Sequence, residues 1–348
     1  MQKVLGTVRR LTHFGSTMAV SDQLESHCVP VSKDACRYCP DPCDEGHDEY
    51  PARFDIDMTS DMFGSVKPYH RQCVISTGKK DWVKEVTEEK GSLAERISNI
   101  NSSLAPKVHP SNSKGDPSLP DGLFVPENST RLAILNGSYN SVDDNGRQTV
   151  LVFPDYKFVL AENSVQDAHD LWLGHLGPEI GIAGQGRLEA YTIPYSAVIL
   201  ICSHKKRDNR CHVAAPKLEH SLRTALEHEG WEVLSQIDDH DGHGEPLNTT
   251  EGSQEQKDQL ALERLKSLAG REPKRALIIY NSHVGGHKFA GNLCIYTPTG
   301  SGVWYGRVTP HNVASIVKNT LVKGEVLPEL LRGGINLSRK DGGSLLSW

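Results

Sequence analysis

Residues 197–211 read AVILICSHKKRDNRC, an apolar run that ends in a cysteine and a polar segment that ends in another. Six consecutive apolar residues, Val and Ile among them, are typical of a buried strand. The sequence therefore predicts a strand over Ala197–Cys202. A polar loop follows, and the next helix is expected from about Pro216 to Glu229, where Gly230 ends it.

Outward from this stretch, predicted strands and helices alternate along both halves of the chain. In the second half, strands are expected at 231–237, 276–280, 293–297 and 303–308, with helices at about 259–268 and 312–321. The first half repeats this order, with strands at 71–77, 131–135, 149–153 and 157–160 and helices at about 81–100 and 164–176. Strand–helix–strand followed by a hairpin and a helix is the order of a thioredoxin-like layer.

The repetition predicts an α/β fold class built from two related domains. We expect a thioredoxin-like domain over 187–348, preceded by a second α/β domain over 61–186. Residues 1–60 show no hydrophobic period and are rich in Cys, Pro and Asp. They are expected to form an irregular leader, ordered only if something staples it.

Composition excludes several classes of function. Among 348 residues, 38 Lys and Arg stand against 44 Asp and Glu, a formal net charge of −6. This balance argues against a general nucleic-acid or anionic-membrane binder and leaves only a local basic patch open. No apolar run approaches the roughly 20 residues that span a bilayer, so membrane insertion is not expected. Eight sparse cysteines predict a reducing compartment. Neither a phosphate loop nor a Rossmann fingerprint occurs.

Two loops carry candidate metal ligands. Cys202 and Cys211 flank the polar loop after the strand, and His283-Val-Gly-Gly-His287 follows the apolar run 276–280. Because loops at the carboxyl ends of parallel strands gather at one sheet edge, both pairs are expected to converge there. Two thiolates and two imidazoles would make a four-ligand set, and the two glycines let the backbone approach a bound object closely.

The nature of the bound metal stays open at this point. Zinc is the first choice for two Cys and two His, but structural zinc sites usually pair cysteines two to four residues apart. The eight residues between these cysteines could instead surround a [2Fe–2S] cluster with two cysteines on one iron and two histidines on the other, as in Rieske chemistry. The Rieske motif, however, mixes Cys and His in each loop.

Three motifs together resemble those of the fungal sucrase/ferredoxin-like family. They are Cys-Ser-His-x-x-Arg-Asp-x-Arg-Cys from residue 202, His-Val-Gly-Gly-His-Lys-Phe-Ala-Gly-Asn from 283 and Gly-Arg-Val-Thr-Pro-His-Asn from 306. The family consists of thioredoxin-like ferredoxins with a bis-histidinyl, non-Rieske [2Fe–2S] cluster. The resemblance implies Cys202 and Cys211 on one iron and His283 and His287 on the other. It is specific across about 193–335 and looser from residue 36 to 176.

The resemblance implies a carrier of single electrons or a redox sensor in oxidant tolerance, more than a hydrolase, since no carboxylate pair for glycoside cleavage stands out. Four basic residues border the cysteine loop and are expected to steer an acidic redox donor such as a flavoprotein reductase. They are Lys205, Lys206, Arg207 and Arg210. A solvated basic loop without that role is the alternative.

Two other functions remain open. A thioredoxin-type thiol oxidoreductase is one, although Cys202 and Cys211 do not form a Cys-x-x-Cys pair at a helix N-terminus. An interaction module with structural zinc is the other. The leader holds a further candidate zinc or thiol site, with free thiols as the alternative, in Cys28, Cys36, Cys39 and Cys43. Cys73 and Cys294 lie in strand-like runs and are expected in the core.

Signals for localisation are divided. Residues 1–21 carry three basic side chains and no acidic one, as in a weak mitochondrial presequence, and residues 331–335 resemble the mitochondrial branch of the family. The terminal Leu346, Ser347 and Trp348 resemble the tripeptide by which clients dock on the cytosolic iron–sulfur assembly machinery. We therefore expect the cytoplasm, with the mitochondrion as the alternative.

Overall fold

A single mixed sheet organises the chain. The computed structural model describes residues 19–40, 43, 45–106, 118–238, 244–340 and 342–348. Within these ranges, twelve strands pair in the order β2-β12-β11-β10-β7-β9-β3-β1-β4-β5-β6, with β8 beside β9. They are β1 Arg71–Ser76, β2 Leu123–Phe124, β3 Leu132–Gly137, β4 Gln148–Phe153, β5 Lys157–Ala161, β6 Ala190–Thr192, β7 Ala197–Cys202, β8 Glu232–Leu234, β9 Arg275–Asn281, β10 Leu293–Tyr296, β11 Gly302–Tyr305 and β12 Leu331–Ile335.

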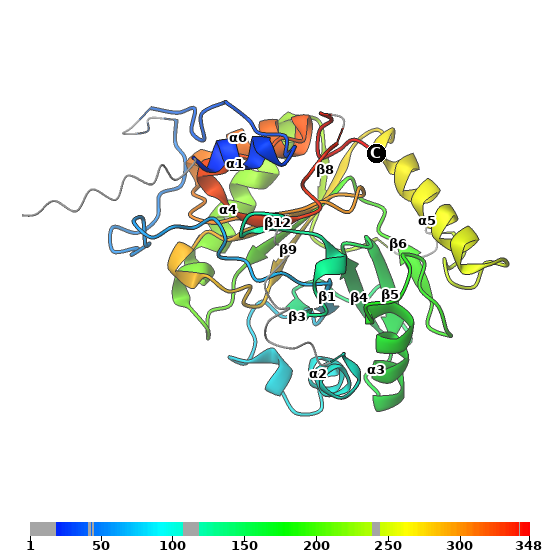
Figure 1. Cartoon of the computed structure of the whole chain (residues 1–348). Coiled ribbons are helices and arrows are strands. Elements are labelled where there is room, and N and C mark those ends of the chain that lie inside the picture. The colour runs from blue at the N-terminus through cyan, green and yellow to red at the C-terminus, as the bar shows by residue number, and fades with distance from the viewer. Residues whose placement is uncertain (1–18, 41–42, 44, 107–117, 239–243, 341) are drawn as a thin grey trace, which may run out of the picture.

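Helices cover the outer faces of the strands. The α-helices are α1 Val20–Ser26, α2 Leu93–Leu104, α3 Val165–Leu171, α4 Asn209–His228, α5 Gln254–Ala269 and α6 Pro310–Ile316, and π-helical turns extend α3 and α6 to Leu176 and Lys323. Figure 1 shows α1, α4 and α6 on one side of the strands and α2 and α3 on the opposite side. No helix in the described ranges is long and apolar enough to cross a membrane.

Both halves have the strand order of a thioredoxin-like layer, which confirms the predicted α/β class. In the second half, β7 is parallel to β9 and antiparallel to β10, which pairs antiparallel with β11. In the first half, β1 stands in the same relations to β3, β4 and β5. A helix connects each parallel pair, α4 after β7 and α2 after β1, as crossover connections require.

The two halves join edge to edge and exchange a strand. At the junction β3 pairs antiparallel with β9 through Gly137 and Asn281. The short strand β2 lies in the first half of the sequence but pairs with β12 at the far edge of the second half. The division at residues 186 and 187 stays a prediction, and the strand exchange means that the halves are interlocked.

Alternating side chains of the strands build three cores. In β7, Ile199 and Ile201 face α4 and α6, whereas Val198 and Leu200 face a central cluster. Val74 of β1 points into that same central cluster, while its neighbours point toward α2 and α3. Because side chains alternate along a strand, each half buries one face under its helices and shares the other with its partner.

Most predicted elements occur, but α2 begins at Leu93 and not at about residue 81, because Ser92 caps it. Two other helices begin earlier than expected. Helix α4 starts at Asn209, because Asp208 accepts a hydrogen bond from the backbone N–H of Arg210 and caps it. Pro216 therefore lies inside the helix and does not begin it. Helix α5 likewise starts at Gln254, where Ser253 and Gln256 form a capping box. The short strands β2, β6 and β12 were not predicted from the sequence.

The described part of the leader packs on the second half. Leu24 of α1 is fully buried in the core beneath α4 and α6. Val31 forms a parallel bridge with Val326, whose N–H donates to the carbonyl oxygen of Pro30 over 2.8 Å. The presequence-like residues 1–18 lie outside the described ranges.

A buried ion network ties the first half together. Asp155, in the turn between β4 and β5, accepts from Arg71 at 2.9 Å and lies 2.8 Å from the ammonium of Lys157. All three side chains are almost fully buried. Burial raises the pKa of Asp155, but its two cations outweigh burial and hold that pKa below the ordinary value. Burial lowers the pKa of Lys157 to about 8.

Candidate functional site

The parallel pair β7 and β9 brings the two predicted ligand loops together. Cys202 at the end of β7 stands opposite Asn281 at the end of β9. The backbone N–H of Ser203 donates to the carbonyl oxygen of Asn281 over 3.1 Å, which fixes the start of both loops. His283 follows two residues later and contacts the Cys202 thiol.

Cys211 reaches the same point from the first turn of α4. Its thiol contacts that of Cys202, and the two side chains are 1% and 2% exposed. Their mutual hydrogen bond lowers the pKa of Cys202 and raises that of Cys211. The early start of α4 thus places a thiol at a helix N-terminus, contrary to the sequence expectation.

The loop that carries both histidines is shaped by glycine and a buried arginine. Gly285 and Gly286 have φ values of +83° and +66°, in the left-handed region that glycine favours. A Cβ on Gly286 would lie 2.2 Å from the guanidinium of Arg332. Arg332 donates to the Gly285 carbonyl oxygen at 3.1 Å and to Oδ1 of Asn292 at 2.8 Å. The rings of His283 and His287 lie 5.5 Å apart, between centroids.

His204 positions the backbone of the first histidine, a role that sequence reasoning missed. Its Nδ1 accepts from the backbone N–H of His283 at 3.2 Å, and its Nε2 donates to the Trp82 carbonyl oxygen at 3.0 Å. His204 is 1% exposed. The residue lies in the Cys-Ser-His motif, but no spacing in the sequence links it to Trp82 in the other half.

The four side chains do not form a compact single-ion group. In the described ranges, one group of Cys and His places its ligand atoms all within 4.8 Å of one another, and it contains none of these four residues. Nδ1 of His283 is buried and has no hydrogen-bond partner among the described residues. The cysteines are buried, whereas His283 is half-buried and His287 is exposed. The set is therefore open toward solvent on its histidine side.

The four basic residues of the cysteine loop differ in their surroundings. Lys205 and Lys206 are exposed. Arg207 pairs with Glu85, and Arg210 lies 2.8 Å from the carboxylate of Asp208, so acidic neighbours balance both arginines. The free positive charge of this loop is therefore concentrated on the two lysines.

The compact group lies elsewhere and includes two of the four leader cysteines. It consists of Cys39, Cys43, His47 and His311 and could hold a metal ion. Hydrogen bonding from His47 lowers the pKa of Cys43 to about 6. The spacing Cys-x3-Cys-x3-His could have indicated His47, whereas nothing in the sequence links His311 to the leader.

The other two leader cysteines, Cys28 and Cys36, lie outside this group. Cys28 is exposed, and Cys36 is buried in the core beneath α6, where burial raises its pKa to about 12. The predicted four-cysteine set is thus divided, and histidines complete the group. Cys73 and Cys294 are buried in strands β1 and β10, which confirms their predicted place in the core.

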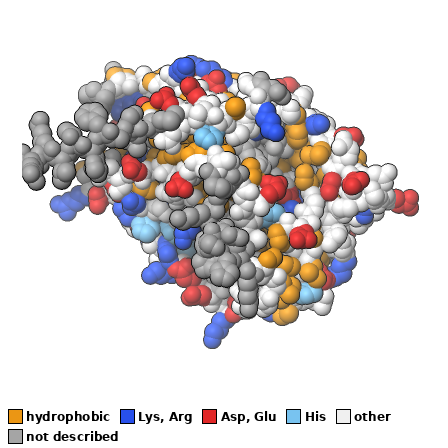
Figure 2. Space-filling view, in the orientation of Figure 1, with side chains coloured by type: hydrophobic (Ala, Val, Ile, Leu, Met, Phe, Trp, Pro, Cys, Tyr) orange, Lys and Arg blue, Asp and Glu red, His pale blue; other side chains and the backbone are white. Residues whose placement is uncertain are grey.

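The terminal tripeptide rests on the molecule's own surface. Leu346 and Trp348 line a pocket together with Trp231, and the ammonium of Lys266 lies 5.8 Å from the Trp348 ring centroid. The Trp348 side chain remains about half exposed. On the face shown in Figure 2, acidic and basic side chains are interspersed.

Comparison with known proteins gives one family. The sequence pattern described as Sucrase/ferredoxin-like matches residues 62–333. Altered inheritance of mitochondria protein 32 of Debaryomyces hansenii is 24% identical over 315 residues, 82% of this chain and 90% of that protein. No solved structure gives a significant match.

Other relatives match over shorter stretches. Altered inheritance of mitochondria protein 32 of Candida glabrata is 30% identical over 149 residues, 40% of this chain and 33% of that protein. Actin patches distal protein 1 of Saccharomyces cerevisiae is 31% identical over 130 residues, 37% of this chain and 31% of that protein. The chain spans about a third of the length of these two relatives.

Proposed function

Because this chain belongs to the sucrase/ferredoxin-like family, we propose that it is a one-electron redox protein whose [2Fe–2S] cluster is held by Cys202, Cys211, His283 and His287. The observation that carries the proposal is the meeting of two buried thiols with a histidine loop at the carboxyl ends of β7 and β9. Two thiolates and two imidazoles are the donor set of a Rieske-type cluster, here in a different sequence arrangement.

One feature of the site favours a cluster over a single zinc ion, and a second is expected of a site for either metal. The ligand atoms of these four residues do not all lie within 4.8 Å of one another, whereas those of a four-ligand group elsewhere in the described chain do. The buried Nδ1 of His283 has no partner among the described residues, as expected of a nitrogen kept for a metal. When bound, a cluster of this type accepts and releases one electron.

The cysteines and the histidines would hold opposite sides of the cluster. Cys202 and Cys211 hold the buried side, and the buried cation Arg332 acts on both thiolates while it fixes the glycine turn. His283 and His287 stand on the solvent side, where a redox partner can approach. A positive charge beside the site favours the reduced state.

Burial disfavours the thiol-oxidoreductase alternative. Cys211 stands at a helix N-terminus, as such a thiol would, but both thiols are at most 2% exposed. A substrate disulfide must reach the attacking sulfur. The same thiols as cluster ligands need no such access.

Iron and sulfide analysis tests the proposal. We expect anaerobically purified protein to be red-brown, with about two irons and two acid-labile sulfides per chain. Cys202→Ser is expected to lose nearly all of both and the visible colour, because one thiolate ligand is removed. The matched control is Cys28→Ser, whose thiol is exposed, whereas those of Cys202 and Cys211 are buried. Colourless wild-type protein without sulfide would refute the proposal.

Charge reversal of the two free lysines tests how a donor docks. Lys205→Glu with Lys206→Glu is expected to slow reduction by an acidic flavoprotein about tenfold at low salt, because attraction becomes repulsion. Stopped-flow reduction at two salt concentrations measures the effect, which should shrink as salt screens it. Reversal of Lys33 and Lys90, both exposed, gives the same net charge outside the loop. Equal rates for both double variants would contradict steering.

The compartment and the assembly partner belong to the same proposal. The half-exposed Trp348 could leave its pocket and offer its ring to the cytosolic iron–sulfur assembly machinery. We accordingly propose a cytoplasmic site of action. The relatives' names, which mention mitochondrial inheritance and actin patches, favour neither compartment.

A further inference from the structure

Four metal-binding side chains from opposite ends of the chain meet beside α6. Sγ of Cys39 lies 3.3 Å from Nδ1 of His311, and Sγ of Cys43 lies 3.2 Å from Nδ1 of His47. The two imidazole rings are 5.2 Å apart between centroids and inclined at 66°. Cys39 and His311 are separated by 272 positions in the sequence. Folding alone therefore brings two sulfurs and two ring nitrogens to one point.

The size of this group fits one ion. Its four ligand atoms all lie within 4.8 Å of one another. Around a tetrahedral zinc, with Zn–S of about 2.3 Å and Zn–N of about 2.0 Å, neighbouring ligand atoms are roughly 3.3–3.8 Å apart. The ligand pairs of a two-iron cluster must stand farther apart, since two metals and bridging sulfides separate them.

Outer contacts of the group are those of a metal site. Nε2 of His311 lies 2.9 Å from Oε1 of Glu49, so a carboxylate orients the ring and leaves Nδ1 for the metal. Carboxylate–histidine–zinc arrangements of this kind fix the tautomer and raise the basicity of the ligand. Nε of Arg37 donates to Sγ of Cys39 at 3.2 Å, which suits a thiolate.

Hydrogen bonds hold the leader against α6 on one side of the group. Thr309 and Asn312 form a capping box at the start of α6, which fixes His311 in the first turn. Asn312 donates to the carbonyl oxygen of Cys36 at 3.0 Å, and Ser315 donates to that of Ala35 at 2.7 Å. Beyond Cys39 the described leader has no regular secondary structure, so a metal would anchor this part.

We propose that Cys39, Cys43, His47 and His311 bind one structural Zn²⁺ ion that fastens the leader to α6. The site is separate from the proposed cluster and uses none of its ligands. Four protein ligands leave no open position, which is the mark of a structural zinc site and not of a catalytic one. Two thiolates with two imidazoles select zinc over hard cations such as magnesium or calcium.

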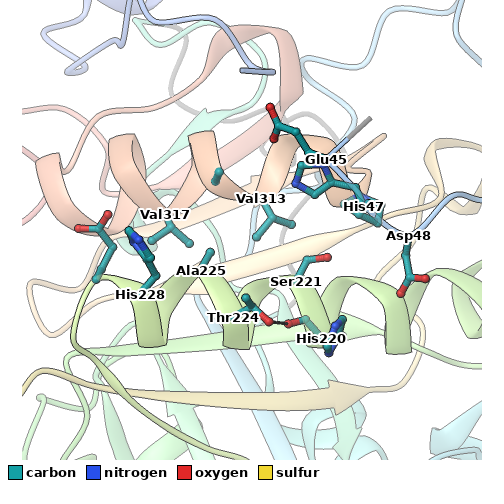
Figure 3. A pocket seen from close by; sticks show the side chains of 14 residues that line it. Glu45, His47, Asp48, His220, Ser221, Thr224, Ala225, His228, Val313 and Val317 are labelled. Carbon is teal, nitrogen blue, oxygen red and sulfur yellow. Dashed lines mark hydrogen bonds between the residues drawn. The ribbon is translucent and has the colours of Figure 1, made fainter. Parts of the chain in front are cut away.

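The anchored segment also closes one wall of a groove. Figure 3 shows Glu45, His47 and Asp48 of the leader lying over the space between α4 and α6, opposite Ser221 and Val313. Because His47 is a proposed ligand, release of zinc would free this wall. Zinc binding would therefore couple the order of the leader to the shape of the groove.

Element analysis of the purified full chain tests the site and separates it from the cluster. We expect about one zinc per chain in addition to iron. Cys43→Ser and His311→Gln should each reduce zinc at least fivefold while iron, sulfide and the visible spectrum stay unchanged. Cys202→Ser should do the reverse. Cys28→Ser, which alters a thiol of the same leader outside the group, should keep both metals.

X-ray absorption at the zinc edge gives a second measurement that needs no variant to fold. The expected shell is two sulfurs at about 2.3 Å and two nitrogens at about 2.0 Å. In the Cys202→Ser variant this shell should persist, because the zinc ligands are intact. A shell of nitrogen and oxygen only, zinc that survives both ligand variants, or a Cys39–Cys43 disulfide in the native protein would each overturn the proposal.

Limited proteolysis tests whether zinc anchors the leader. Chelation of zinc is expected to speed tryptic cleavage after Arg37 and Arg53 about tenfold, because the leader loses its anchor. Cleavage after residues of α4 should be unchanged. If chelation removes zinc without faster cleavage of the leader, the anchoring role is wrong even though the ion binds.

Discussion

A variant in which His283 and His287 are both replaced by cysteine is expected to have a reduction potential at least about 250 mV below that of the wild type. Rieske-type sites with two histidines lie at roughly −150 to +300 mV, whereas four-cysteine ferredoxins lie near −400 mV. Each thiolate adds a negative charge that opposes reduction. A redox titration followed by visible absorption or electron paramagnetic resonance measures the shift.

Single replacements give the control for this shift. His287→Cys alone should fall between the wild type and the double variant, because it adds one of the two charges. His228→Cys, an exposed histidine on α4, should leave the potential unchanged. A double variant that retains the wild-type potential while keeping two irons would show that these histidines are not ligands.

Asp155→Asn is expected to destabilise the fold by about 3–5 kcal/mol at neutral pH, because it leaves the buried cations Arg71 and Lys157 without their carboxylate. Urea unfolding followed by circular dichroism measures the loss. Asp144→Asn, an exposed change two residues before Gly146, is the matched control and should stay within about 0.5 kcal/mol. A loss below about 1 kcal/mol for Asp155→Asn would contradict the network.

The effect of Asp155 should also depend on pH. Its pKa is lowered in the folded protein, so its contribution is present above the unfolded pKa and is lost as pH falls through the folded pKa. The difference between wild type and Asp155→Asn should therefore narrow in acid. Lys157, with a pKa of about 8, binds fewer protons folded than unfolded between pH 8 and its ordinary value of about 10.5. The free energy of unfolding therefore rises with pH through that window, because the cost of burying the charged Lys157 falls.

The long strands and their order could be predicted because their signals are local. The apolar run of Ala197–Cys202 predicts β7 to the residue. The start of α4 could not be predicted in the same way. Proline is common in the first turn of a helix, but Pro216 is the eighth residue of α4. The pairing of β2 with β12 depends on tertiary contacts between short segments, which carry no periodic signal.

The candidate sites show the same limit. Strand ends predict that Cys202 and His283 approach each other, since parallel register follows from the fold class. The group of Cys39, Cys43, His47 and His311 could not be predicted. His311 lies far from the others in the sequence, and the residues beside it indicate only the start of a helix. Cys36 fits the spacing pattern of Cys39 and Cys43 but is turned into the core.

The shared core between the halves makes them a single cooperative unit. Tyr296 of β10 stacks on Phe153 of β4, with ring centroids 4.1 Å apart, and its hydroxyl hydrogen-bonds that of Tyr69. Unfolding of either half would strip these aromatic faces from the other, so both should melt in one transition. A destabilised variant of the first half would then shed its metals although every ligand is intact. Metal loss alone therefore does not identify a ligand in this protein, unless the melting temperature is preserved.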